Sequence, residues 1–220
     1  MKWNLFVTSV SALKRGAREL PREMAKSRKS VKKRDAILRA AIEVINVKGY
    51  AHATMAEIAA ALDLVEGALY YYFPNKQALV FACHCRSLER FEALLTEAAA
   101  GGETGAAKLR YFLNDLLRDS ARNGPLLYYG EFSYLDADQS RDVTQWADRL
   151  KARLERFLTD GMGDGSILPC RSDLVANLLL GMLIWLAKWV PDVEGLTADE
   201  LMAAITALTF RGLEGIKSPG

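Results

Sequence analysis

Residues 49–76, GYAHATMAEIAAALDLVEGALYYYFPNK, carry the signals of two short helices joined by a tight turn. Thr54 and Glu57 have the T-x-x-E spacing of a capping box, in which each side chain binds a free backbone N–H at a helix start. Apolar residues then recur at the spacing of one helix face, at Met55, Ile58, Ala59 and Leu62. The first half of the stretch therefore predicts a short helix with one buried face.

The second half of the stretch predicts a turn and another short helix. Asp63 and Leu64 interrupt the apolar pattern and suit a tight turn. A helix over 66–73 then carries three consecutive tyrosines, and Pro74 with Asn75 ends it. Two such helices form a helix-turn-helix, whose second helix can lie in the major groove of DNA.

As a set, these residues resemble the DNA-binding domain of the TetR family of bacterial transcription regulators. The matching residues are Gly49, Tyr50, Thr54, Ile58, Ala59, Gly67, Ala68, Leu69, Tyr70, Tyr71, Tyr72, Phe73, Asn75, Lys76 and Leu79. The resemblance implies a second, helical domain that holds a ligand pocket and a dimer interface formed by its last two long helices. It also implies a regulator that is most commonly a repressor. The three cysteines have spacings that suggest no disulfide framework, so we expect reduced thiols and a cytoplasmic protein.

The rest of the chain likewise shows helical periodicity and no strand signals, which predicts an all-α fold. We expect a basic extension over 1–30, a three-helix DNA-binding domain over 31–76 and a larger helical domain over 77–220. The remaining helices are expected over 35–47, 75–100, 105–122, 125–135, 139–161, 171–190 and 197–214. The helix over 171–190 is apolar on nearly every face and needs partners on all sides. A homodimer through 171–190 and 197–214 would supply one of them.

Charge is distributed unevenly along the chain. Residues 1–76 contain 14 Lys and Arg against 7 Asp and Glu, whereas the whole chain has a net charge of only +2. A basic first third joined to an acidic remainder indicates a polyanion partner for the first part. The basic run that includes Lys32 and Lys33 abuts the helix-turn-helix, so it either contacts phosphates or forms a solvated tail.

Several other classes of function have little support. Cys83, His84 and Cys85 resemble a metal tripeptide, but residues two apart on a helix face away from each other, so we expect no metal site. With only two histidines and no triad or phosphate loop, we expect no enzyme and no cofactor. The apolar run over 174–190 is short for a membrane span and contains Lys188, so no membrane partner is expected.

The predicted DNA contacts combine residues of the motif with the adjacent basic run. They are Thr54, Glu66, Gly67, Tyr70, Tyr71, Tyr72, Lys76, Lys32 and Lys33. A tyrosine offers a hydroxyl to phosphate and a ring edge to a thymine methyl. Lys76 matches the phosphate-contacting lysine of the family, and Gly67 permits close backbone approach. The partner would be a near-palindromic double-stranded operator.

Two positions depart from the family pattern. Val65 stands where the family commonly has a capping Ser or Thr, which costs about 1 kcal/mol and removes a phosphate donor. Glu66 follows it, where a basic or neutral residue is usual. Glu66 either accepts a hydrogen bond from a cytosine amine or is a solvated acid in the first helical turn.

The second domain is rich in aromatic residues that suit an apolar ligand pocket. The candidates are Phe112, Tyr128, Tyr129, Phe132, Trp146 and Trp185. The end of the chain, residues 185–215, resembles TetR-type regulators of lipid and steroid breakdown, which implies an acyl-CoA-like effector. Two alternatives remain: a nonspecific, nucleoid-type DNA-binding protein, and a membrane-surface protein acting through its basic N-terminus.

Overall fold

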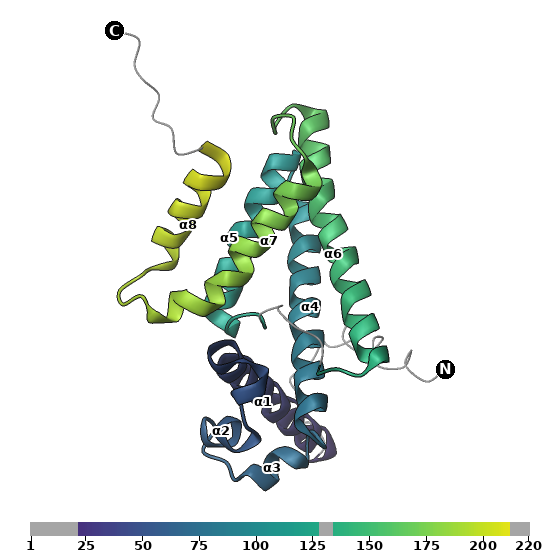
Figure 1. The fold of residues 1–220 in the computed structure, drawn as a ribbon, viewed down its shortest axis with the longest axis vertical. Helices are drawn as coiled ribbons and strands as arrows, with labels where there is room; N and C mark the ends of the chain where they lie inside the picture. Colours follow the sequence, from purple (N-terminus) through teal and green to yellow (C-terminus); the bar gives the residue numbers. More distant parts are fainter. Residues whose placement is uncertain (1–21, 128–133, 212–220) are drawn as a thin grey trace. The chain divides into compact units, whose positions relative to one another are not determined.

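The computed structural model describes residues 22–127 and 134–211, and all regular structure within those ranges is helical (Figure 1). The prediction of an all-α fold is therefore confirmed. Eight α-helices and two short irregular helices follow one another there, in the order α1 (Arg22–His52), α2 (Met55–Ala60), α3 (Glu66–Tyr70), α4 (Lys76–Gly101), α5 (Gly105–Asn123), α6 (Ala137–Asp164), α7 (Ser172–Trp189), η1 (Val190–Asp192), α8 (Ala198–Thr206) and η2 (Ala207–Arg211).

Contacts divide the chain into two units, Met1–Arg34 and Asp35–Gly220, and the second unit contains both hydrophobic cores. Helix α1 crosses the boundary between the units. The helix expected to end at Val47 continues further, but Gly49 interrupts the helical backbone, with φ 76° and ψ 165°. That region of backbone space is almost closed to residues with a side chain. One further helical turn then leads to His52.

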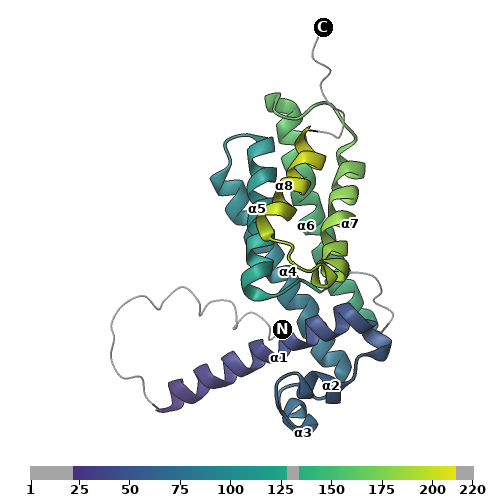
Figure 2. The same cartoon turned by 90° about the vertical axis from the view of Figure 1, so that its left-hand side faces the viewer.

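The first core lies among α1, α2, α3 and the start of α4. Its fully buried members include Ile37, Ile42, Ile58, Leu69 and Leu79. Ile58 and Leu69 fix α2 and α3 against α1, so the opposite face of α3 is left for solvent. This arrangement is the predicted three-helix bundle with its helix-turn-helix (Figures 1 and 2).

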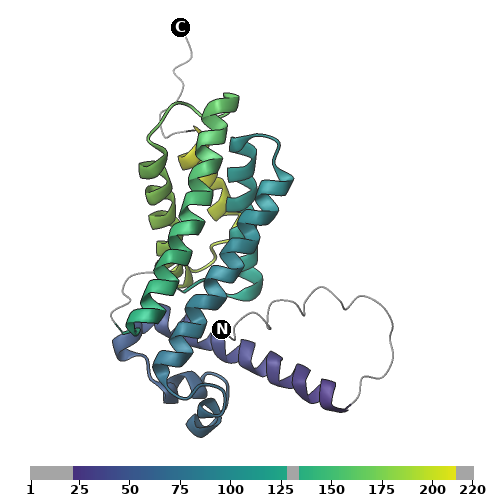
Figure 3. The same ribbon diagram turned by 90° about the vertical axis from the view of Figure 1, so that its right-hand side faces the viewer.

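Helix α4 belongs to both cores. Leu79, Val80 and Cys83 lie in the first core, whereas Leu88 and Phe91 lie in the second. Figure 3 shows α4 leaving the short helices and continuing alongside α5 and α6, with which it is in contact. One helix thus joins the two cores without a break.

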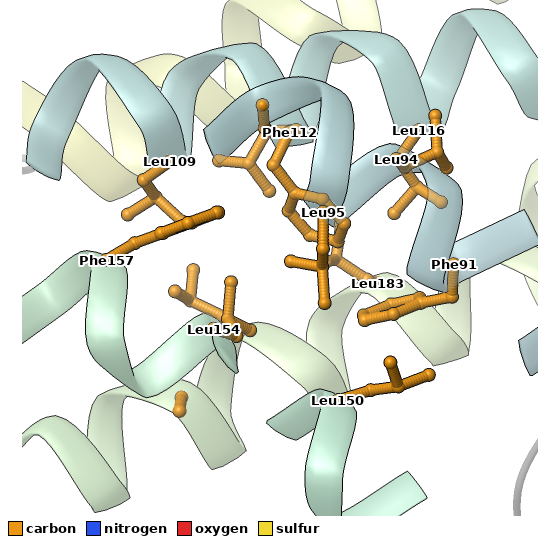
Figure 4. Close-up of a cluster of buried hydrophobic side chains, with 14 of the residues drawn as sticks. Phe91, Leu94, Leu95, Leu109, Phe112, Leu116, Leu150, Leu154, Phe157 and Leu183 are labelled. Carbon is orange, nitrogen blue, oxygen red and sulfur yellow. The ribbon is translucent and has the colours of Figure 1, made fainter. Parts of the chain in front are cut away.

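The second core is formed by side chains from α4, α5, α6, α7 and α8. Figure 4 shows Phe91 and Leu95 of α4 pointing toward Phe112 of α5, with Leu154 and Phe157 of α6 on the opposite side. The rings of Phe91 and Phe112 pack edge to face with centroids 5.0 Å apart. This geometry is among the favourable ones for aromatic pairs.

The start of α5 is fixed against the end of α6 by a close glycine contact. A Cβ atom on Gly105 would lie 2.1 Å from the backbone nitrogen of Gly161. The Gly105 N–H also donates to a carboxylate oxygen of Asp164 at 2.7 Å, and Lys108 pairs with Asp160 at 2.9 Å. The helix expected over 139–161 continues to Asp164, so Gly161 lies inside α6, where it forms the docking point for α5.

Helix α7 is buried on one face only. Ala176, Leu179 and Leu183 reach the second core. Outward-facing residues recur every three or four positions along one stripe, at Leu174, Leu178, Gly181, Trp185 and Trp189. Leu178 keeps 74% of its surface exposed, and a Cβ on Gly181 would touch nothing within 4 Å. We call these five residues the α7 stripe.

By length and composition, one helix among the described residues could cross a membrane. It corresponds to Ser172–Asp192, with a mean hydropathy of 1.7 and only 17% of that window buried. The inner face of α7 packs in the second core. The low buried share therefore reflects the apolar outer face of α7, which is exposed in a single protomer.

Several expected helices differ from the structure. The helix expected over 35–47 begins at Arg22 and reaches His52 across the interruption at Gly49, and the helix expected over 66–73 ends at Tyr70. Residues 125–127 and 134–135, expected to lie in one helix, are not helical, and 128–133 fall outside the described residues. The expected helix over 197–214 is shorter: α8 ends at Thr206, and a π-helical turn, η2, follows to Arg211. Residues 212–214 lie outside the described range.

Candidate nucleic-acid interface and ligand cavity

The start of α2 is held by the capping box that the sequence predicts. The Glu57 N–H donates to the Thr54 hydroxyl oxygen at 3.2 Å, and the Thr54 N–H donates to the Glu57 carboxylate at 3.1 Å. Lys48 donates to the same carboxylate at 2.5 Å. These hydrogen bonds, that from Lys48 first, lower the pKa of Glu57. Thr54 itself is exposed.

Helix α3 presents polar and aromatic groups on its outer face. Val65 precedes it without a side-chain cap, as its residue type implies. The Tyr70 hydroxyl donates to the Glu66 carboxylate at 3.0 Å, and this bond raises the pKa of Tyr70. Tyr71 is 82% exposed and meets the half-buried Tyr72 edge to face, with ring centroids 5.1 Å apart. The three tyrosines therefore lie in different environments.

Lys76, in the first turn of α4, is held over an aromatic ring. Its Nζ lies 4.2 Å from the centroid of the Tyr50 ring, within the range of a cation–π interaction. Partial burial lowers the pKa of Lys76, while the charge of Glu57 opposes that shift. The side chain of Asn75 caps the same helix by accepting from the Ala78 N–H at 2.8 Å. The ammonium group thus has a fixed position beside α3.

The Tyr50 ring continues into a stack that extends toward the second core. Tyr134 lies parallel to Tyr50 with centroids 3.8 Å apart, and its hydroxyl lies 2.8 Å from Nε2 of His84. Burial lowers the pKa of His84 to about 4. His84 is therefore neutral near pH 7. Contacts join Lys76, Tyr50, Tyr134 and His84 in a row, and the single positive charge of this row is on Lys76, at the end nearest solvent.

Gly67 lies in α3 without any steric need for glycine within the protein. A Cβ atom there would meet nothing within 4 Å, and its φ is not positive. Glycine in a helix costs about 0.5–1 kcal/mol relative to alanine. The structure therefore gives no packing reason for glycine here, and Gly67 stays a predicted DNA contact.

Lys32 and Lys33 lie on the N-terminal part of α1, in the first unit of the chain. Lys32 is exposed and Lys33 is half-buried. Most of the predicted basic extension, residues 1–21, lies outside the described residues. Both lysines remain predicted phosphate contacts.

A cavity of about 520 Å³ opens among α4, α5, α6, α7 and the start of α8. Its wall is mostly aliphatic, with Leu88, Leu117 and Leu183 among the lining residues. Polar side chains at its edge include Thr144, Asp148 and Lys151, of which the first two are exposed. A largely apolar wall with a few polar groups is typical of small-molecule sites.

The aromatic residues predicted to line a pocket lie elsewhere where the structure describes them. Phe112 is fully buried within the second core, and Trp146 donates from Nε1 to the Glu92 carboxylate at 3.0 Å. Trp185 belongs to the α7 stripe and is 53% exposed. None of the three lines the cavity. Tyr128, Tyr129 and Phe132 fall outside the described residues.

Two features of these sites were not expected from the sequence. Tyr50 belongs to the motif, but its support of Lys76 depends on a contact across 26 residues. Leucine is the commonest residue type in the cavity lining, and leucine gives no sequence signal that separates a cavity wall from a core. Spacing alone could have indicated Phe91, which lies on the apolar stripe of α4 and does line the cavity.

Known proteins share this fold and parts of this sequence. The structure of PfmR from Thermus thermophilus matches with a TM-score of 0.68 and 25% identity, over 81% of this chain and 99% of that one. AibR, solved in complex with isovaleryl coenzyme A and operator DNA, matches with a TM-score of 0.67, covering 81% of this chain and 98% of that one. At 23% identity, that likeness shows the fold alone.

Curated relatives are similar over part of their length. The HTH-type transcriptional repressor KstR of Mycolicibacterium smegmatis is 30% identical over 132 residues, which is 59% of this chain and 64% of the relative. KstR of Mycobacterium tuberculosis is 28% identical and is covered over 60% of its length. The aligned regions thus span less than two thirds of these relatives.

Two family profiles match the chain. That of the bacterial regulatory proteins of the tetR family matches residues 37–83, and that of the tetracyclin repressor-like C-terminal domain matches residues 102–213. The first covers the helix-turn-helix, and the second covers α5 to α8, which include the α7 stripe and most of the helices around the cavity. The chain therefore belongs to the TetR family of bacterial regulatory proteins.

Proposed function

We propose that this protein is a transcriptional repressor that binds a near-palindromic operator as a homodimer and releases it when an apolar effector occupies the cavity. The helix-turn-helix bundle carries this proposal, because α2, held by its capping box, packs with α3, and α3 presents an exposed tyrosine to solvent. Lys76 follows at the start of α4, over the Tyr50 ring. The relatives named KstR are described as transcriptional repressors, which supports the same activity here.

The DNA contacts divide into groups that position the protein and groups that read bases. Thr54, Lys76, Lys32 and Lys33 offer hydroxyl or ammonium donors to phosphates, which fix the register without reading sequence. Tyr71 and Tyr72 face the major groove and contact base edges or thymine methyl groups. Tyr70 and Glu66 are bonded to each other, so we propose that they act as one unit at the edge of the groove.

Alanine substitutions at Tyr71 and Lys76 should have different effects on DNA binding. Tyr71→Ala should weaken binding to an operator selected in vitro by about 1–3 kcal/mol and leave nonspecific binding unchanged. Lys76→Ala should weaken binding to all sequences and lower the salt slope by about one. Fluorescence anisotropy at several salt concentrations measures both effects.

Two positions on α5, outside the bundle, provide controls for these variants. Tyr111 is a half-exposed tyrosine on α5, and Lys108 lies on the same helix. Tyr111→Ala and Lys108→Ala should leave operator affinity unchanged. Equal affinity of Tyr71→Ala and Lys76→Ala with the unmodified protein would show that these two residues do not contact DNA.

Replacing Gly67 with alanine should separate folding from DNA binding. The added methyl group meets nothing within the protein, so stability should rise by about 0.5–1 kcal/mol in urea unfolding. The same methyl group should weaken operator binding by about 1–3 kcal/mol if the α3 backbone packs closely on DNA. Increased stability with unchanged operator affinity would rule out that close approach.

We propose that the homodimer forms through α7 and α8. The α7 stripe is apolar, exposed and regularly spaced, and Gly181 at its centre lets a second helix approach closely. Leu208, in the π-helical turn after α8, adds another half-exposed apolar side chain. A second copy of the stripe would cover these residues without placing α7 in a membrane, and would set two α3 helices to reach successive major grooves.

The effector is proposed to be an acyl thioester of coenzyme A or a related molecule with an apolar chain and a polar end. The aliphatic wall of the cavity suits the chain, and Thr144 and Lys151 at its edge suit polar or anionic groups. The AibR complex shows that a protein with this fold can hold isovaleryl coenzyme A together with operator DNA.

Effector binding should lower operator affinity about 100-fold, which requires about 2.7 kcal/mol of differential binding. Acyl-CoAs of increasing chain length would be titrated into the labelled operator complex while anisotropy is followed. Free CoA and a detergent of equal chain length are the controls. Acyl-CoAs that bind without changing operator affinity would contradict ligand release, and absence of binding would contradict the ligand class while leaving the DNA-binding proposal intact.

A further inference from the structure

The residues that follow α5 form a short non-helical segment, Pro125–Leu127, that contacts both cores. Leu126 packs against the second core, whereas the next residue, Leu127, is a buried member of the first core. All three residues of the segment also line the cavity. The same stretch of backbone is therefore part of the cavity wall and part of the DNA-binding bundle.

Buried polar side chains fix this segment to the bundle from two helices. Asn46 of α1 donates from Nδ2 to the Leu126 carbonyl at 2.9 Å, and the Leu127 N–H donates to the Ser87 hydroxyl oxygen of α4, also at 2.9 Å. Asn46 is 2% exposed and Ser87 is fully buried. Buried polar groups keep their partners because water cannot replace them.

The start of the segment is held by an arginine of α4. Arg90 donates to the Gly124 carbonyl at 2.7 Å and to the Pro125 carbonyl at 3.3 Å, and it pairs with Asp119 of α5. The end of α5 and Pro125 thus move with α4. The next two residues are bonded differently. Leu126 accepts a hydrogen bond from Asn46 of α1, and Leu127 donates one to Ser87, which lies nearer the bundle on α4.

We propose that Pro125–Leu127 transmits occupancy of the cavity to the DNA-binding bundle, and that Asn46 and Ser87 are the positioning residues through which it does so. This inference rests on the proposed function, because it specifies how effector and operator compete. A ligand that displaces Leu126 moves the carbonyl to which Asn46 is bonded, and hence α1 and the α2–α3 pair packed on it. Since Leu127 fills the first core, the segment cannot shift without disturbing that core.

Coupling of this kind is reciprocal and is measured as a ratio. The ratio of operator affinities with and without saturating hexadecanoyl-CoA gives the coupling factor, about 100 for the unmodified protein on the proposal above. Operator affinity without ligand and ligand affinity without operator are measured separately. The coupling factor can then change while both separate affinities stay the same.

Asn46→Leu and Ser87→Ala are the test variants. Leucine keeps the size of asparagine but cannot donate to Leu126, and alanine removes the acceptor for the Leu127 N–H. Each variant should keep both separate affinities within about threefold and should lower the coupling factor at least about tenfold. Thr96→Val is the control, since the Thr96 hydroxyl donates to the Glu92 carbonyl and accepts from Arg153, away from the segment, and its coupling factor should remain unchanged.

Two results with these variants would overturn the proposal. One is a full coupling factor in both folded variants. The other is loss of operator affinity in ligand-free Asn46→Leu with ligand affinity intact, because that result would mean that the hydrogen bond only maintains the bundle.

A cavity-filling substitution tests the same route without any ligand. Ala147 of α6 lines the cavity, and Ala147→Phe would place apolar volume inside it. Operator affinity should fall at least about tenfold in the otherwise unmodified protein, and by clearly less in the Asn46→Leu background. An equal fall in both backgrounds would overturn the proposed route. Because no acyl-CoA is used, failure of the ligand class cannot be mistaken for failure of the coupling segment.

Discussion

Leu178→Asp is expected to convert the protein into a monomer and to lower operator affinity by about 10²- to 10⁴-fold. Leu178 is 74% exposed within the α7 stripe, next to Gly181 along it, so the substitution costs the isolated protomer little. In a dimer, two carboxylates would be buried without partners near each other. Loss of the dimer removes the contact with the second half-site. Linking two binding modules commonly raises affinity by about 10²- to 10⁴-fold, so this is the expected loss.

Light scattering at micromolar concentration and operator anisotropy measure the two effects together. Leu168→Asp is the matched control, because Leu168 is 84% exposed and lies between α6 and α7, outside the stripe. It should remain dimeric with full operator affinity. A Leu178→Asp protein that is still dimeric would show that the interface lies elsewhere, and a monomer with tight operator binding would refute the homodimer requirement.

Gly105→Ala should destabilise the fold by about 3 kcal/mol, the upper part of the range for overpacked interiors. The added methyl carbon would lie 2.1 Å from the Gly161 nitrogen and 2.3 Å from the Phe157 carbonyl oxygen. These are backbone atoms that cannot rotate away, so α5 must separate from α6. For a chain of this length, the expected fall in Tm is about 6–12 °C.

Gly163→Ala provides the opposite result in the same region. Gly163 lies in α6, and a Cβ there would meet nothing within 4 Å, so alanine should stabilise the helix by up to about 1 kcal/mol. Thermal melts followed by circular dichroism, at one fixed protein concentration, compare the two variants. Equal stability of Gly105→Ala and the unmodified protein would show that the two helices do not approach as closely as described.

The local signals in the sequence predicted the helix-turn-helix well because its determinants are close together. Thr54 and Glu57 cap α2 through bonds three residues apart, and the break at Asp63 coincides with a residue at φ 54°. Gly49 marked the interruption of α1 for a similar reason. These features depend on backbone geometry within a few residues, so neighbouring residues are sufficient to predict them.

Features that depend on distant contacts were not predicted from the sequence. Leu126 and Leu127 were expected within a helix, but their hydrogen bonds to Asn46 and Ser87 hold them in a non-helical segment. The aromatic residues chosen for a pocket were selected by type, whereas Phe112 fills a core and Trp185 lies on the α7 stripe. Residue type does not distinguish a core, a cavity wall and an uncovered face.

The shared position of α4 has a consequence for folding. Leu79 and Val80 belong to the first core and Leu88 and Phe91 to the second, while Leu127 enters the first core from beyond α5. A fragment cut after Cys83 would lose Leu127 and expose the apolar pocket that it fills. The helix-turn-helix should therefore not be an autonomous folding unit. Hydrogen exchange should show amides on both sides of Ser87 opening in a single cooperative event.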